Sequence, residues 1–168
     1  MSSQEALAAD RAGDLVLAAK LYEAAIAKGE SSLDAFLNLA LLYWQSTDPG
    51  MAASKRLTAA FMNTASRRMT ELLEEAERRH PSSTAVKFWK RYIAWTDLGG
   101  PAPEKSFCRG LLREAPTVLV PAMYLFSASD GLEAKVEATE LLQQARADGT
   151  TGARYVSSFL EATMETLR

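Results

Sequence analysis

The chain contains one histidine, His80, and one cysteine, Cys108. Together they are too few for a Cys/His zinc site, which needs four ligands. His80 precedes Pro81 at the expected end of a helix, where a cation is favoured by the helix dipole. Cys108 shares an apolar helix face with Leu111, which is typical of a small buried hydrophobe rather than a nucleophile. We therefore expect neither residue to be catalytic or to bind metal.

Other signatures of enzymes are missing too. Glu74 and Glu75 each precede an arginine by four residues, so they predict exposed ion pairs with Arg78 and Arg79 on a helix. The glycines at 99–100 lack the flanking residues of a phosphate-binding or dinucleotide-binding loop. We predict a non-enzymatic protein with no catalytic, metal-binding or cofactor-binding residues, and no cofactor.

Basic side chains gather in the middle of the chain, with Trp89 and Tyr92 among them. Aromatic rings interleaved with cations can stack on single-stranded nucleic acid. Nearby glutamates and a net charge of −2 argue against that use. Nucleic-acid binding therefore stays a secondary alternative, and its candidate residues are Arg67, Arg68, Lys87, Lys90 and Arg91.

The composition is that of a globular protein, with 48% hydrophobic and 24% charged residues among 168. The first residues lack the basic start and apolar run of a secretory signal. No stretch approaches the roughly 18 apolar residues of a membrane span. A single cysteine excludes an intramolecular disulfide, which favours a reducing compartment. We expect a cytoplasmic protein that does not interact with membranes.

Apolar residues recur at spacings of three and four almost throughout, which predicts an all-α fold. Short breaks rich in Pro, Gly, Ser and Asp separate the helices, so sequence neighbours should pack antiparallel. We predict one domain over residues 1–168 with about nine helices, at 3–12, 15–28, 33–46, 51–79, 84–98, 103–114, 118–128, 131–147 and 152–167.

Several helix starts carry capping residues. Asp14 and Asp48 each precede a predicted helix, and Pro49 after Asp48 suits the first turn. Ser31 or Ser32 can cap the helix 33–46. We predict capping boxes for Ser2 with Glu5 and for Asp130 with Glu133. In a capping box, the side chain of each of the two residues accepts a hydrogen bond from the backbone N–H of the other.

The most informative pattern is an internal repeat. Ala18, Tyr22 and Ala25 lie at spacings of four and three on one helix face, and Gly29 follows four residues later. Small residues let two helices approach closely, and the larger residue fills the space between them. The same ladder recurs at Ala138, Leu142 and Ala145 before Gly149, at Met69, Leu73 and Ala76 before Pro81, and at Cys108 and Leu111 before Pro116.

Residues 12–46 resemble the tetratricopeptide repeat family. The ladder from Ala18 to Ala25 matches the second helix of that repeat, and residues 35–43 match the first helix of the next. Residues 88–100 are similar to the related half-a-tetratricopeptide repeats, whose first helix carries such a tryptophan and tyrosine. The resemblance implies an α–α superhelix, a solenoid of antiparallel helix pairs that binds another protein.

Two segments depart from a regular array. Gly29 and Pro81 are 52 residues apart where the repeat implies about 35, so an irregular insertion is expected near 47–66. It either extends the neighbouring helix or forms a helix of its own. The last helix, 152–167, carries Tyr155 and Phe159 at a four-residue spacing, which suits a capping helix or a dimer face.

In the register of the family, one side of the helix 33–46 lines the concave groove. Family members that clamp a carboxylate use lysine and asparagine there, whereas this chain has leucines and a tryptophan, so the groove is expected to take an apolar or amphipathic segment. Alternatively, the helix 51–79 or the last helix covers it. The partner-binding candidates are Leu37, Asn38, Leu41, Trp44 and Gln45.

These observations predict a protein–protein interaction adaptor or scaffold whose partner is another protein or a peptide. Two alternatives stay open: a dedicated chaperone or immunity protein for a secreted effector, and an RNA-associated module that uses the central basic and aromatic cluster. A homodimer is compatible with the last helix.

Overall fold

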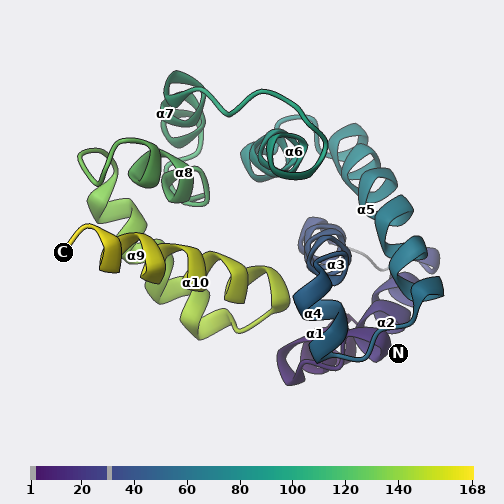
Figure 1. Ribbon diagram of the computed structural model, residues 1–168. Helices are drawn as coiled ribbons and strands as arrows, with labels where there is room; N and C mark the ends of the chain where they lie inside the picture. Colours follow the sequence, from purple (N-terminus) through teal and green to yellow (C-terminus); the bar gives the residue numbers. More distant parts are fainter. Residues whose placement is uncertain (1–2, 30–31) are drawn as a thin grey trace. The chain divides into compact units, whose positions relative to one another are not determined.

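A computed structural model describes residues 3–29 and 32–168 (Figure 1). Every regular element in these ranges is a helix, which confirms the all-α class. No helix in the same ranges is both long and apolar enough to cross a lipid bilayer. The helices are α1 (Ser3–Ala12), α2 (Leu15–Ala27), α3 (Leu33–Ser46), α4 (Pro49–Ser54), α5 (Ala59–Arg79), α6 (Thr84–Asp97), α7 (Lys105–Glu114), α8 (Pro121–Ala128), α9 (Lys135–Asp148) and α10 (Thr151–Thr166).

The predicted caps of α2, α3 and α4 are present. The side chains of Asp14, Ser32 and Asp48 each accept a hydrogen bond from the backbone N–H three residues later, at 3.1, 3.4 and 2.8 Å. These bonds satisfy donors that have no partner inside the helix. The predicted capping box of Ser2 with Glu5, and the alternative cap Ser31, involve residues outside the described ranges.

The region predicted as one helix over 51–79 is two separate helices, so ten helices, not nine, occur in the described residues. α4 ends at Ser54, and Arg56 adopts a left-handed φ of 53° that a helix cannot contain. Thr58 then caps α5 by accepting from Phe61 N–H at 3.1 Å. The insertion near 47–66 therefore supplies a short helix of its own.

The predicted capping box of Asp130 with Glu133 is wrong. α9 begins only at Lys135, and Asp130 lies in the turn before it with a φ of 53°. The N–H of Glu133, which the side chain of Asp130 was expected to accept from, donates instead to the hydroxyl of Ser129 at 2.9 Å. The Glu133 carboxylate instead binds Arg109 through two bonds of 2.6 and 2.8 Å.

The helices form two compact units. The first unit contains the chain up to Pro81 together with Asp148–Ala153, and the second contains Ser82–Ala147 and Arg154–Arg168. The short segment 148–153, which includes the turn between α9 and α10, thus belongs to the first unit although most of both helices belongs to the second.

In the first unit, α1 packs with α2 and α2 with α3, and α3 packs with α5 across the intervening short helix α4 (Figure 1). The predicted ladder forms this core, because Ala18, Tyr22 and Ala25 are all buried. Met69, Leu73 and Ala76 on α5 are buried as well. The small residues at these positions permit close helix contact, as the sequence predicted.

In the second unit, α6 packs with α7 and α7 with α8. An aromatic cluster fills its core. Tyr92 is buried at its centre, its ring stacks on Phe88, and its hydroxyl shares a hydrogen bond with the hydroxyl of Tyr155. Trp95 lies at the edge of the cluster, edge-on to Tyr124, with 37% of its surface exposed. Phe88, Trp89 and Tyr92 of α6 are thus core residues.

Candidate binding surface

The apolar groove candidates on α3 are not an open surface in this structure. Leu37, Leu41 and Trp44 are buried, whereas Asn38 and Gln45 are partly exposed. Leu41 lies under the first turn of α10: a Cβ placed on Gly152 would approach Leu41 Cδ1 to 2.6 Å. This face was expected to be either an open groove or covered by another helix. At Leu41 it is covered, by the start of the last helix.

A buried carboxylate holds this cover in place. Asp10 is fully buried and accepts hydrogen bonds from the Thr151 N–H at 2.9 Å and the Thr151 hydroxyl at 2.6 Å. The hydroxyl of Tyr22 donates to the same carboxylate at 3.2 Å. Burial, reinforced by the charge of Asp10, raises the pKa of Tyr22. Next to this group, Arg11 donates to the backbone carbonyl of Asp148 at 2.8 Å.

Asp10 has a structural role that the sequence analysis missed. The available signal was its position one residue after Ala9 and four after Ala6, which places a charged residue on the buried face of α1. Such a residue needs polar partners inside the protein. Nothing local indicates that those partners lie 141 positions away.

The first half of the basic cluster is neutralised by carboxylates. The guanidinium of Arg68 binds both oxygens of Glu23, each at 2.9 Å, and also binds Glu71 at 2.7 Å. Arg67 binds Glu71 at 2.8 Å. Hydrogen bonds from Arg68 and then Arg67 lower the pKa of Glu71, and the bonds to Glu23 raise the pKa of Arg68. Tyr43 also donates to Glu23, at 3.1 Å, so these groups form one network.

The other half of the cluster belongs to the second unit. Lys87 binds Glu114 at 3.0 Å, and Lys90 and Arg91 are partly exposed on α6. Trp89 and Tyr92, the aromatic residues expected to stack on bases, are buried. The five cations are thus divided between two compact units, and at least three of them, Arg67, Arg68 and Lys87, bind carboxylates. No single unit presents them together with exposed rings.

The thiol of Cys108 is fully buried, as predicted. Burial raises its pKa to about 11, so the thiol is neutral at physiological pH and a poor nucleophile. Within residues 3–29 and 32–168, no group of three or more His, Cys, Asp or Glu side chains is placed to hold a metal ion.

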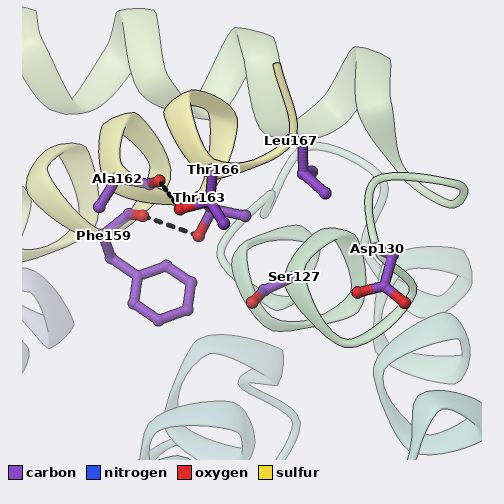
Figure 2. Close-up of a pocket in the computed structure, with 7 residues that line it drawn as sticks. All are labelled: Ser127, Asp130, Phe159, Ala162, Thr163, Thr166 and Leu167. Atoms are coloured by element: carbon purple, nitrogen blue, oxygen red, sulfur yellow. Dashed lines mark hydrogen bonds between the residues drawn. The ribbon is translucent and has the colours of Figure 1, made fainter.

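The second unit has a pocket of about 310 Å³ where α8 and α10 end (Figure 2). We call it the C-terminal pocket. Ser127 and Asp130 line it from the end of α8, and the last turns of α10 line it from the other side. The ring of Phe159 and the side chain of Leu167 supply apolar surface. The full lining is Ser127, Asp130, Phe159, Ala162, Thr163, Thr166 and Leu167.

Two lining hydroxyls are held by their own helix. Thr163 donates to the carbonyl of Phe159 and Thr166 to the carbonyl of Ala162, both at 2.9 Å (Figure 2). These are the back-bonds that threonine makes to the preceding helical turn. They fix the two side chains, so the polar atoms of the wall are preorganised.

Three large apolar side chains of the second unit are exposed, and one of them, Leu167, lines the pocket. Leu132 is 87% exposed, Val136 is 76% exposed, and Leu167 is 43% exposed. Leu167 connects this group to the pocket: it lines the pocket, and a Cβ on Gly131, next to Leu132, would lie 2.8 Å from its Cδ1. We call Leu132, Val136 and Leu167 the apolar rim. An exposed apolar group beside a pocket is typical of an interaction surface.

The comparisons with known proteins identify no relative. The sequence matches no protein-family model, and searches of curated proteins and of solved structures found no similar protein. The resemblance to tetratricopeptide repeats therefore stays a prediction from the residues.

Proposed function

We propose that this protein is a non-enzymatic adaptor that binds a segment of another protein, with the C-terminal pocket and the apolar rim as its binding surface. The observation that supports the proposal best is the exposure of Leu167, which lines the pocket, together with that of Leu132 and Val136 in the same unit. Single exposed apolar residues need no explanation, but several in one unit with a pocket suit a partner.

Burial of the rim would contribute to affinity. Covering a leucine or valine side chain that is otherwise exposed stabilises a complex by about 1.5–3 kcal/mol. Val136 lies in the first turn of α9, and Leu167 directly follows the last residue of α10. Residues held on helices lose little freedom on binding, which reduces the entropic cost of association.

The proposal moves the expected binding site away from α3. Leu37, Leu41 and Trp44 are buried in the structure, so we place the partner at the second unit instead. We further propose that the pairwise packing of α1 with α2, α2 with α3, α6 with α7 and α7 with α8 is part of a tetratricopeptide-like superhelix. A cytoplasmic location is proposed on the single reduced Cys108.

The test is affinity capture from the native host with three baits: the wild type, the double variant Leu132→Ser with Val136→Ser, and the control Val16→Ser. Val16 is 52% exposed and belongs to the first unit, so its replacement removes exposed apolar surface outside the proposed binding surface. We expect a specific partner to be retained by the wild type and the control and lost by the double variant.

Equal retention by all three baits would overturn the assignment of the surface. Circular dichroism and urea unfolding of each bait establish that a loss of binding is not a loss of fold. Analytical ultracentrifugation of the purified wild type and the double variant determines whether the captured partner is a second copy of the chain.

A further inference from the structure

We propose that the C-terminal pocket receives a basic side chain, arginine or lysine, from the partner segment. This inference rests on the proposed function and specifies what enters the pocket. It is drawn from the polar atoms of the lining, the two helix ends and the placement of the nearby carboxylates.

The side-chain oxygens of the pocket can all accept hydrogen bonds. Thr163 and Thr166 use their hydroxyl protons in bonds to helix carbonyls, so neither hydroxyl is available to donate to an occupant. The Asp130 carboxylate accepts only, and the Ser127 hydroxyl can accept as well as donate. An occupant that carries several N–H donors and no acceptor matches such a lining, and the arginine and lysine heads have this character.

Backbone donors near the pocket are already used. The N–H of Asp130 donates to the carbonyl of Ser127 at 3.2 Å, and the N–H of Gly131 donates to that of Phe126 at 2.8 Å. The N–H of Leu167 donates to the carbonyl of Thr163 at 3.2 Å. An anionic occupant would therefore find one side-chain donor in the lining, the Ser127 hydroxyl, in the same pocket as the negative charge of Asp130, which is unfavourable.

Two helices end at the pocket with their C-termini. α8 ends at Ala128, between the lining residues Ser127 and Asp130, and α10 ends at Thr166, itself a lining residue. The C-terminus of a helix carries a partial negative charge that stabilises a nearby cation. Both helix ends thus act in the same direction as the charge of Asp130.

Asp130 is the only charged side chain among the lining residues. Two other carboxylates of this unit are already paired: Glu133 with Arg109, and Glu161 with Arg146. Arg168, which follows Leu167, is exposed and is not part of the lining. The pocket therefore has an excess of negative charge that a cation from a partner would balance.

The apolar lining suits the rest of a long basic side chain. Arginine and lysine bury their methylene stems against apolar surface while the charged head stays with polar groups. Phe159 and Leu167 offer that surface, and the face of an aromatic ring also attracts a cation. Neighbouring apolar residues of the same partner segment would then reach the apolar rim.

The experiment uses short peptides and the full chain. The probes are acetyl-Ala-Leu-Arg-Leu-Ala-amide, the same peptide with citrulline, which is a neutral analogue of arginine, and free arginine amide. Binding is followed by amide chemical shifts of the labelled protein during titration. The variant is Asp130→Asn, and the control variant is Glu140→Gln, which removes an equal charge from an exposed position on α9.

We expect the arginine peptide to shift the amides of Ser127, Asp130 and Thr163, and to bind about fivefold more tightly than the citrulline peptide, the upper range for an exposed charge pair. Asp130→Asn should remove this preference and Glu140→Gln should keep it. Raising the salt concentration should weaken the arginine peptide more than the citrulline peptide.

Three results would overturn the inference. Equal binding of both peptides at the pocket would make it a neutral apolar site, and the proposed adaptor surface would survive. Tighter binding of free arginine amide than of the peptide would indicate a small-molecule site. Chemical-shift changes only outside the pocket, or no changes at all, would show that the pocket does not bind a basic side chain. The capture experiment with the rim variants would then still decide the adaptor function.

Discussion

Asp10 and Thr151 are 141 positions apart in the chain and are joined by two hydrogen bonds, from the Thr151 N–H at 2.9 Å and from its hydroxyl at 2.6 Å. The carboxylate is fully buried, so both bonds form away from water. A buried carboxylate is stable only with such partners. This pair ties the first helix to the turn between α9 and α10.

We therefore predict that Asp10→Asn destabilises the protein by about 1–3 kcal/mol, because the bonds from Thr151 then go to a neutral amide oxygen instead of a charged acceptor, and the amide NH2 replaces the oxygen that accepts from Tyr22. Urea unfolding measures the change. Thr151→Val and the double variant complete a mutant cycle, in which we expect a coupling energy of about 1 kcal/mol or more. Additive effects of the two substitutions would show that the pair is not coupled.

Replacing Gly152 tests the cover over Leu41. A Cβ there would lie 2.6 Å from Leu41 Cδ1 and 3.0 Å from Leu41 Cβ, so Gly152→Val should cost about 1–3 kcal/mol of stability by overpacking. Leu41→Ala in the same chain should recover part of this loss, because it removes the atoms that clash. Thermal unfolding provides the measurement.

A matched control is Gly110→Ala in α7, where a Cβ would have no atom within 4 Å. Alanine favours a helix over glycine by about 1 kcal/mol, so this variant should be more stable than the wild type. If Gly152→Val were as well tolerated as Gly110→Ala, the start of α10 would not lie on Leu41.

The buried thiol gives a prediction for alkaline pH. Burial raises the pKa of Cys108 from its ordinary 9.0 to about 11, so the folded state keeps the proton that the unfolded state loses. The stabilisation is complete below pH 9.0 and is lost as the pH rises toward 11, by about 2 kcal/mol in total. The measurement is a set of unfolding curves of the wild type and Cys108→Ala between these pH values. Both proteins contain the same tyrosines, so the difference between their pH dependences is the contribution of the thiol.

The same burial predicts that a thiol reagent reacts with native Cys108 only as fast as the protein opens. Reaction at pH 8 should accelerate strongly when urea unfolds the chain. A thiol that reacts equally fast in the folded and unfolded protein would contradict the packing of α7.

The network around Arg68 predicts sensitivity to acid. Its hydrogen bonds lower the pKa of Glu71 below the ordinary 4.5, so the pair stabilises the fold at neutral pH and is lost as the pH falls through the lowered value. Arg68→Met should reduce stability at neutral pH slightly and flatten the dependence of stability on pH below 4.5. Stability measured against pH for both proteins is the check; unchanged stability at neutral pH would mean that Arg68 is available for other partners.

Much of the fold was predictable because helix signals are local. The caps at Asp14, Ser32 and Asp48 act on N–H groups three residues away, and the ladder of Ala18, Tyr22 and Ala25 repeats with the helix period. The local prediction of a cap at Asp130 was wrong, because the N–H of Glu133 donates to Ser129 instead and Asp130 itself has a left-handed backbone.

The binding surface was less accessible to sequence reasoning. Leu37, Leu41 and Trp44 have the spacing of a groove, but whether such a face is open depends on what another segment places over it. Gly152 lies in a segment more than a hundred positions later. The C-terminal pocket likewise combines the end of α8 with the end of α10, which no local pattern links.

The sequence alone thus determined that the chain is helical, where most helices begin and end, and which small and large residues face the core, because these properties depend on neighbours within four residues. The tertiary structure decided which faces are covered. Asp10 binds Thr151, Leu41 lies beneath Gly152, and Asp130 lines the same pocket as Phe159 and Thr163. Each of these depends on contacts between residues far apart in the chain, and the physical reason is that burial and pairing belong to the packed molecule rather than to any single helix.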